Sequence, residues 1–266
     1  MVKVIDYKNL KAIIKQLDIA GTCVVRGLFS ESDCKNIASK MEWLGLGNGP
    51  HIINPDREQH LTAQTADHLA KLQHLERIQY LKKIKSVSRF LRQVMKNEAV
   101  LKILSKFSKA PVTVLNSQYL FKKHGTKYGN QSFVPHQDAV TYKPSNESLV
   151  SCQLSISGMN KKRGGLFVVP GSHKYGLLEA EQSYDFSKQA KGNVKGVHNL
   201  CQTPKGLKRY YPEALPGDLI FVRAYCIHGS DANRAKGTDR QIFAWMTARR
   251  DTKYLRGRYA DPRPLF

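Results

Sequence analysis

The chain has 266 residues, of which 41% are hydrophobic and 24% are charged. These values are ordinary for a globular protein, so a packed core is expected, and disordered, collagen-like and disulfide-stapled chains are excluded. The 43 lysines and arginines outnumber the 21 aspartates and glutamates to give a net charge of +22, which attracts anionic partners and says nothing about the fold.

The N-terminal segment carries no recognisable targeting signal. Its first 18 residues lack an apolar stretch and contain Asp6 and Asp18, so neither a secretory signal nor a transit peptide is expected. No apolar run approaches the roughly 20 residues that a membrane-spanning helix needs. The five cysteines form no C-x-x-C pair, which favours reduced thiols and a cytoplasmic protein.

Residues 1–110 are expected to be mainly helical. A capping-box pattern at Ser30–Asp33 begins one helix, in which apolar residues then recur at intervals of three and four. A second amphipathic helix is expected from about Asp67 to Met95, packed on the core by its apolar stripe. Residues 45–60 are rich in glycine, asparagine and proline, and are expected to form a loop.

Residues 111–250 contain short runs rich in β-branched and aromatic residues, separated by turns. Many short strands indicate a mainly β sandwich or barrel rather than a parallel α/β fold. We expect one domain over residues 1–266, with a jelly-roll core at about 111–250 that is supported by helices at about 1–110. The long polar segment 174–214 is expected to form a lid over a pocket. The predicted strands are 111–121, 131–136, 149–157, 165–170, 218–228 and 241–248, with an earlier strand in 21–29.

Two histidines and an aspartate have the spacing of a metal site. His136 and Asp138 lie two residues apart at the end of a predicted strand, so their side chains share one face. His228 ends a second predicted strand, just before a Gly-Ser turn. Two histidines and one carboxylate that leave other positions open form the facial triad of non-haem Fe(II) oxygenases. The alternative is a histidine and an aspartate in a surface turn.

An arginine follows His228 at a distance that suits a co-substrate site. Guanidinium is always charged and binds carboxylates through two hydrogen bonds, which fits the distal carboxylate of 2-oxoglutarate. Arg240 lies twelve residues after His228, and a hairpin through Asn233–Asp239 is expected to return it beside the strand of His228. By its distance from His228 alone, Arg234 could fill the same role, but it lies in the turn between the two strands and is expected to be solvated.

Four segments resemble, in order, the phytanoyl-CoA dioxygenase family of Fe(II)/2-oxoglutarate oxygenases: GTCVVRGLFSESDC, PHQD, RGGLFVVPGSHKYG and PGDLIFVRAYCIHGSDANRAKGTDRQIF. The resemblance covers about Gly21 to Ala248, and the combination of segments is specific although each alone is not. It implies a double-stranded β-helix, a cupin-like jelly roll, with one iron. It also assigns the metal ligands to His136, Asp138 and His228, the salt bridge to 2-oxoglutarate to Arg240, and a pocket position near the co-substrate to Gln137.

Two departures from the family pattern affect the expected pocket rather than the metal. Gln153 stands where some members have an aromatic residue, and Arg163-Gly164-Gly165 replaces the common Asn-Gly. Relatives that halogenate carry a small residue in place of the aspartate, so the intact Asp138 favours hydroxylation or desaturation.

Some polar residues leave two interpretations open. His173 either orients the substrate or holds its own turn. Asn116, Gln118 and Tyr119 of the predicted strand 111–121 either face the pocket or pack within the sheet. Lys122 and Lys123, which follow, either contact an acidic substrate or are solvated.

The expected function is hydroxylation of an unactivated C–H bond of a small metabolite, free or carried as a thioester, with O2 consumed and 2-oxoglutarate converted to succinate and CO2. The basic charge leaves open general solubility, an anionic substrate, or a nucleic-acid substrate. Nucleic acid is not favoured, because no basic motif with interleaved aromatics and no groove-reading helix is evident. A catalytically silent binding module of the same fold is the remaining alternative, and the intact triad with Arg240 argues against it.

Overall fold

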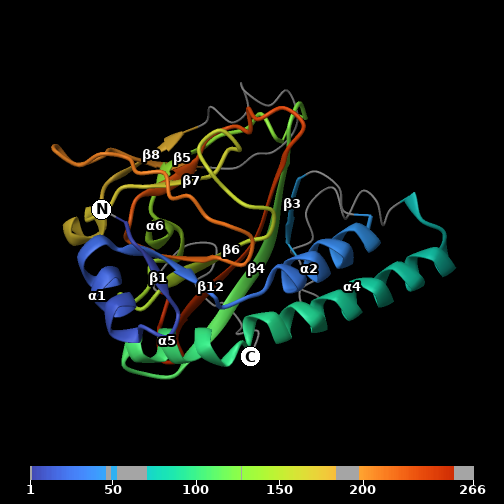
Figure 1. Cartoon of the computed structure of the whole chain (residues 1–266), viewed down its shortest axis with the longest axis horizontal. Helices are drawn as coiled ribbons and strands as arrows, with labels where there is room; N and C mark the ends of the chain where they lie inside the picture. The colour runs from blue at the N-terminus through green and yellow to red at the C-terminus, as the bar shows by residue number, and fades with distance from the viewer. Residues whose placement is uncertain (1, 46–48, 53–70, 127, 184–197, 255–266) are drawn as a thin grey trace.

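A seven-stranded sheet and a three-stranded sheet form the core of this computed structural model, which describes residues 2–45, 49–52, 71–126, 128–183 and 198–254. The sheets pack face to face as a jelly roll, and a two-stranded ribbon, β8 (Ala180–Ser183) with β9 (His198–Cys201), contacts the smaller sheet (Figure 1). The expected double-stranded β-helix is thereby confirmed. In spatial order, the larger sheet consists of β1 (Val4–Asp6), β2 (Thr22–Arg26), β10 (Leu219–Arg223), β6 (Val150–Ser155), β12 (Asp239–Arg249), β4 (Val112–Lys123) and β3 (Gly49–Ile52), and the smaller of β5 (Phe133–His136), β11 (His228–Ser230) and β7 (Leu166–Val168).

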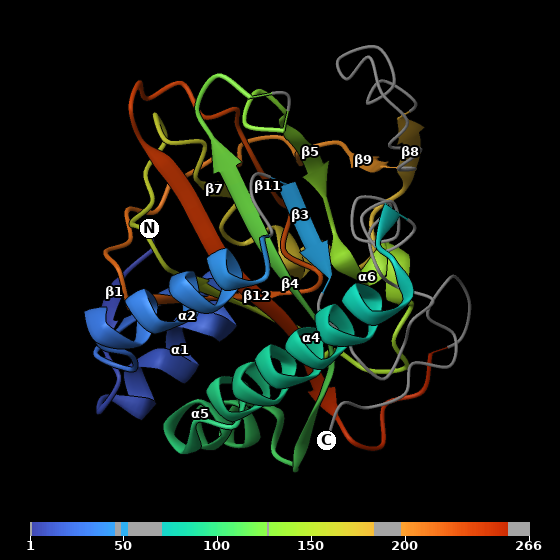
Figure 2. The same ribbon diagram turned by 90° about the vertical axis from the view of Figure 1, so that its right-hand side faces the viewer.

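Four of the described helices cover the outer face of the larger sheet (Figure 2). The predicted capping box at Ser30 is confirmed, because its hydroxyl accepts the Asp33 N–H while the Asp33 carboxylate accepts the Ser30 N–H. The predicted second helix is confirmed from His74, whereas residues 67–70 lie outside the described part of the chain. The four helices are α1 (Leu10–Ala20), α2 (Glu31–Trp43), α4 (His74–Met95) and α5 (Glu98–Ser108); α6 (Asp138–Tyr142) and a short 3-10 helix (Ser172–Tyr175) follow β5 and β7.

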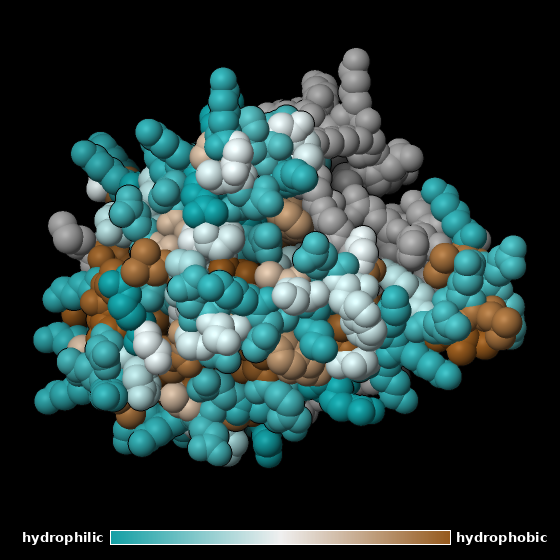
Figure 3. Space-filling model, turned by 45° about the vertical axis from the view of Figure 1, so that its right-hand side comes forward, coloured by the Kyte–Doolittle hydropathy of each residue, from teal (hydrophilic) through white to brown (hydrophobic). Residues whose placement is uncertain are grey.

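The apolar stripe of α4 is buried from Tyr80 onward but exposed in the first turns of the helix. Val87 and Leu91 are buried, whereas Leu75 is 72% exposed and Ile78 is 37% exposed. The helix extends past the larger sheet (Figure 1), and apolar residues are visible at the protruding end of the molecule where it begins (Figure 3). None of the described helices is both long and apolar enough to cross a bilayer.

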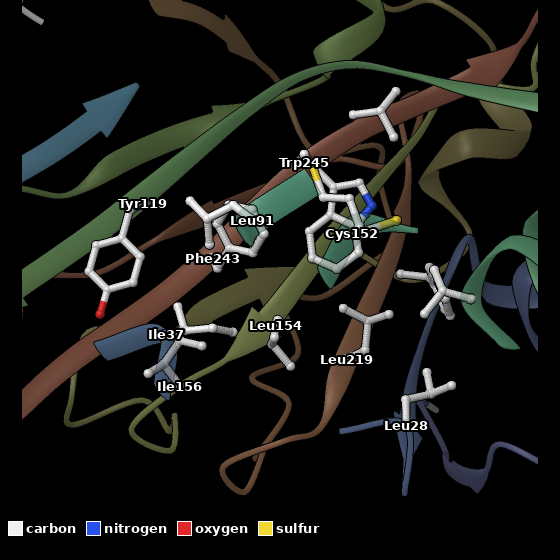
Figure 4. Close-up of a cluster of buried hydrophobic side chains, with 14 of the residues drawn as sticks. Leu28, Ile37, Leu91, Tyr119, Cys152, Leu154, Ile156, Leu219, Phe243 and Trp245 are labelled. Atoms are coloured by element: carbon white, nitrogen blue, oxygen red, sulfur yellow. The ribbon is translucent and has the colours of Figure 1, made fainter. Parts of the chain in front are cut away.

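The larger sheet separates an apolar layer beneath the helices from a second layer between the sheets. On β12, Phe243 and Trp245 pack toward the helices, while Ile242 and Ala244 point between the sheets. This division follows from the alternation of side chains along a strand. Figure 4 shows Phe243 and Trp245 beside Leu91, so the helices and the sheet share one core.

Replacing Phe243 with alanine is expected to lower the free energy of unfolding by about 3–5 kcal/mol, because the ring is fully buried and its loss leaves a cavity. Urea denaturation followed by far-UV circular dichroism measures the change. The matched control, Leu75→Ala, removes an exposed side chain and is expected to change stability by no more than about 0.5 kcal/mol. Equal losses in the two variants would contradict this description of the core.

Two sequence-based predictions about strands are wrong in part. Residues 49–52 were expected in a loop, but they form β3, which pairs with β4 at the edge of the larger sheet. The run 218–228 was expected to be one strand, but it breaks after Arg223, where the Cys226 N–H donates to the Arg223 carbonyl in a tight turn. The chain thereby crosses from the larger sheet to the smaller one, and this crossing brings His228 to the interior.

The segment 174–214, predicted to be a lid, is partly a packed ribbon in the described residues. β8 and β9 pair with each other, and Tyr210 exchanges two backbone hydrogen bonds with Val168 of β7 at 2.8 and 2.9 Å. Residues 184–197 lie outside the described part of the chain. The described flanks therefore belong to the wall of the smaller sheet.

Candidate metal centre

His136, Asp138 and His228 meet between the two sheets. His136 ends β5 and His228 begins β11, and the two are directly paired in the smaller sheet with ring centroids 4.4 Å apart. The Asp138 carboxylate lies 3.8 Å from His136 Nε2 and 3.5 Å from His228 Nε2. Among the described residues, this is the one cluster of three or more potential ligands whose ligand atoms all lie within 4.8 Å of one another.

The second nitrogen of each imidazole determines which atom faces the aspartate. His136 Nδ1 lies 2.7 Å from the Val134 carbonyl oxygen, and His228 Nδ1 lies 3.0 Å from the Cys226 carbonyl oxygen. A carbonyl can only accept, so Nδ1 carries a proton, and in the neutral ring each Nε2 presents a lone pair. Two lone pairs and a carboxylate thus converge at distances too long for hydrogen bonds, and a bound cation satisfies all three. Two imidazoles and one carboxylate form the donor set of non-haem Fe(II).

Asp138 reaches this point from a helix rather than from the strand that its spacing suggests. β5 ends at His136, and Asp138 is the first residue of α6. The Ala139 N–H donates to the Ala224 carbonyl at 3.0 Å, which fixes this start of α6 against the turn between β10 and β11. The carboxylate still points toward His136, so the two side chains converge although only one belongs to the strand.

The Gln137 side chain points away from the cavity and so does not occupy the pocket position expected for it near the co-substrate. The residue is fully buried, and its Nε2 donates to the carbonyls of Gly176 (2.9 Å) and Tyr225 (2.6 Å). Its Oε1 accepts the Leu178 N–H at 2.9 Å. Neighbours in extended backbone point to opposite sides, so a residue between two ligands faces away from the metal. The amide instead joins the metal-binding segment to two loops.

Arg240 lines the same cavity from the opposite sheet. It pairs with Lys122 of β4 in the larger sheet, whereas His228 belongs to the smaller sheet, so the expected return beside the strand of His228 is wrong. The side chain is 1% exposed, and its Nε donates to the Gly164 carbonyl at 3.1 Å. Arg234 is exposed in the preceding turn, in agreement with the sequence-based expectation.

The charge of Arg240 has no counterion among the described residues, none of which places a carboxylate within 4 Å of the guanidinium. Burial lowers the pKa of Arg240 to about 10, which leaves it charged at neutral pH. A buried cation that opens into a cavity without a counterion favours an anionic ligand. The residues present therefore fit the distal carboxylate of 2-oxoglutarate.

A second buried basic side chain lies beside Arg240. Lys122 is fully buried, and its Nζ donates to Ser230 Oγ at 2.9 Å and to the Asp231 carbonyl at 2.7 Å. Burial, and to a lesser extent the charge of Arg240, lower the pKa of Lys122 well below its ordinary value. Lys123 is exposed, so the two lysines lie in different environments. Alternation along the strand places their side chains on opposite faces of the sheet.

His173 lies outside the cavity. Its Nε2 is 3.0 Å from the Asp18 carbonyl oxygen near the end of α1, and its imidazole packs against the backbone of Gly21. Burial lowers its pKa, which favours the neutral ring. Of its two expected roles, the structure therefore supports the structural one, in which His173 joins the PGSH turn to the first helix.

The space between the sheets, with its open mouth, is about 630 Å³. The cavity is lined by Asn116, Gln118, Leu120, Phe133, His136, Asp138, Tyr142, Ser151, Gln153, Leu166, His228, Gly229, Ser230, Arg240, Ile242 and Met246.

Comparison with known structures supports the fold. The epimerase SnoN from nogalamycin biosynthesis, in complex with Fe3+, alpha ketoglutarate and nogalamycin RO, superimposes with a TM-score of 0.66 over 97% of this chain and 96% of that one, at 16% identity. EvdO2 from Micromonospora carbonacea var. aurantiaca, complexed with 2-oxoglutarate, gives a TM-score of 0.60 over 95% and 94% of the two chains, at 13% identity. At these identities the likeness concerns the fold.

Curated relatives are similar over part of their length. A probable phytanoyl-CoA dioxygenase from Caenorhabditis elegans is 31% identical over 108 residues, which is 40% of this chain and 33% of that protein. The peroxisomal phytanoyl-CoA dioxygenase of Bos taurus is 25% identical over 145 residues, 54% of this chain and 42% of that protein. The matched segments thus span about a third to two fifths of these relatives. The family model for phytanoyl-CoA dioxygenase (PhyH) matches residues 17–242, so the chain belongs to the phytanoyl-CoA dioxygenase family.

Proposed function

We propose that the protein is an Fe(II)/2-oxoglutarate-dependent oxygenase that hydroxylates an unactivated C–H bond of a small organic substrate. One observation carries the proposal: three convergent metal-ligating groups line one cavity with a buried arginine that has no counterion among the described residues. The three ligating groups suit Fe(II), and the arginine suits the distal carboxylate of 2-oxoglutarate. Family membership supports the same activity.

The residues have separate roles in this proposal. His136, Asp138 and His228 would hold the iron through two imidazole nitrogens and one carboxylate. Bound iron supplies the oxygen chemistry, in which 2-oxoglutarate and O2 yield succinate, CO2 and the hydroxylated substrate. Arg240 binds the distal carboxylate and orients the co-substrate, and Leu120, Ile242 and Leu166 form apolar walls that limit the access of water.

The test is release of succinate from 2-oxoglutarate by the iron-loaded protein. Release is expected to require Fe(II) and O2, and to proceed slowly even without a second substrate. Asp251→Ala, which changes an exposed carboxylate far along the chain from the triad, is the matched control for Asp138→Ala and is expected to retain release. Succinate formed equally by the Asp138→Ala variant would refute the proposed activity.

The net charge is expected to affect encounter with 2-oxoglutarate only weakly. Charged residues are spread along the chain, and hydrophilic residues cover much of the face seen in Figure 3 rather than one patch. Between about 50 and 200 mM salt, kcat/KM for 2-oxoglutarate is therefore expected to fall by less than about tenfold, with kcat unchanged. Initial rates at low and saturating 2-oxoglutarate measure both. A larger loss would mean that the charge steers anionic ligands.

A further inference from the structure

The register of the larger sheet orders the side chains along the cavity. On the face between the sheets, every second residue of β4, β12 and β6 lies in a row with its neighbours across the strands. The first row is charged, the second is mainly apolar, and the third and fourth contain amides and a hydroxyl. The rows are Lys122–Arg240, Leu120–Ile242–Ser155, Gln118–Ala244–Gln153 and Asn116–Met246–Ser151.

The metal ligands lie between the charged row and the amide rows. Ser230 at one end of β11 accepts a hydrogen bond from Lys122, which places that end of the strand at the first row. His228 is two residues back along β11, roughly 7 Å further along the cavity. On the far side, Asn116 Nδ2 donates to the Tyr142 hydroxyl, which ties α6 to the fourth row. Asp138 begins the same helix, so the triad faces the middle of the cavity.

The end of the cavity beyond the metal is polar but uncharged. Gln153 and Ser151 are nearly buried, and the one hydrogen bond of the Gln153 amide within the described residues is a long donation to Ser151 Oγ at 3.4 Å. Gln118 is exposed at the cavity mouth and makes no side-chain hydrogen bond to the described residues, so the buried amide of this end is that of Gln153. Among the described residues that line the cavity, Arg240 is, apart from the triad, the one that is charged at neutral pH. It lies at the opposite end of the cavity from these amides.

This composition discriminates between classes of substrate. A buried amide left without a partner costs about 1–3 kcal/mol, so an alkyl chain in this end would be penalised. A charged group would be buried there without a counterion, which costs more. A neutral group with several hydrogen-bond donors and acceptors satisfies the amides without either penalty.

We propose that Asn116, Gln118, Ser151 and Gln153 form the substrate subsite, and that it recognises a neutral amide or hydroxyl-bearing group instead of an aliphatic acyl chain. The inference rests on the proposed function, because it names the substrate class of the same cavity. It departs from the acyl thioesters that the names of the curated relatives indicate. Gln153, opposite Ala244 in the third row, contributes the central amide.

The experiment measures stimulation of succinate release by two libraries. One contains neutral carbohydrates, nucleosides and small amides; the other contains free fatty acids and straight and branched acyl-CoA thioesters. At least one neutral compound is expected to raise release about tenfold or more over the rate without a second substrate, and to bind the 2-oxoglutarate-loaded protein in calorimetry. Gln153→Leu is expected to raise the KM for that compound at least about tenfold, since the leucine cannot hydrogen-bond.

Two controls separate the outcomes. Gln202→Leu changes an exposed glutamine outside the cavity and is expected to leave the KM unchanged, and iron content verifies that each variant is folded. Stimulation by acyl compounds, or by no neutral compound, would overturn the subsite while 2-oxoglutarate turnover by the wild type persists. Absence of any 2-oxoglutarate turnover by the iron-loaded wild type would instead refute the proposed function.

Discussion

Replacing Asp138 with alanine is expected to abolish tight binding of Fe(II). The carboxylate is the one anionic group of the triad, and without it two neutral imidazoles remain to hold a dication. Changes in outer-shell partners alone cost roughly 10–100-fold in metal affinity, so loss of a direct ligand is expected to exceed about 100-fold. Anaerobic titration with Fe(II), followed by metal analysis after gel filtration, measures the stoichiometry.

The companion variant His136→Ala removes a ligand from the other end of the same short segment and is expected to behave in the same way. Asp251→Ala is expected to bind one iron per chain, because its carboxylate is exposed and bonds to Arg249. Stoichiometric iron retained by both Asp138→Ala and His136→Ala would eliminate the triad as the metal site.

Replacing Arg240 with alanine is expected to weaken 2-oxoglutarate binding by about 100-fold while one iron remains bound. The guanidinium is buried without a counterion, so a carboxylate that reaches it forms a charge-assisted pair in a medium of low polarity. A 100-fold change corresponds to about 2.7 kcal/mol, which lies within the roughly 2–5 kcal/mol that loss of one partner of a buried charge pair costs in binding. Calorimetry with 2-oxoglutarate on the anaerobic iron-loaded protein measures the dissociation constant directly.

Arg234→Ala is the matched control, because Arg234 is exposed in the turn that precedes β12. Its dissociation constant for 2-oxoglutarate is expected to equal that of the wild type. Pyruvate carries the same keto-acid group without the distal carboxylate, so its weak binding is expected to be insensitive to Arg240→Ala. If Arg234→Ala, and not Arg240→Ala, weakened 2-oxoglutarate binding, the assignment of the anionic site would be wrong.

Local spacing was sufficient to place His136 beside Asp138 and to predict most strands, whereas the assignment of His228 to the same site rested on the family resemblance. The residue pattern H-x-D places the two side chains near each other whether the second residue belongs to a strand or to the first turn of a helix. The predicted proximity of His136 and Asp138 therefore holds although α6 begins at Asp138. Capping at Ser30 is also local, and it was found in the sequence. These features depend on backbone periodicity alone.

Features that depend on contacts distant in the chain were missed. The division of 218–228 into β10 and β11 depends on a turn that packs against α6, and the apolar run gives no sign of it. Gln137 turns away because two loop carbonyls and a loop N–H capture its amide. The burial of Lys122 depends on Ser230, more than 100 residues later in the chain. Spacing cannot specify such partners.

Anomalous scattering at the iron edge from crystals grown anaerobically with Fe(II) and 2-oxoglutarate tests the central claim most directly. We predict one anomalous peak per chain, in contact with His136 Nε2, His228 Nε2 and the Asp138 carboxylate, with 2-oxoglutarate density extending from the peak to the Arg240 guanidinium. A peak elsewhere, an empty triad in iron-loaded crystals, or 2-oxoglutarate bound away from Arg240 would contradict the account.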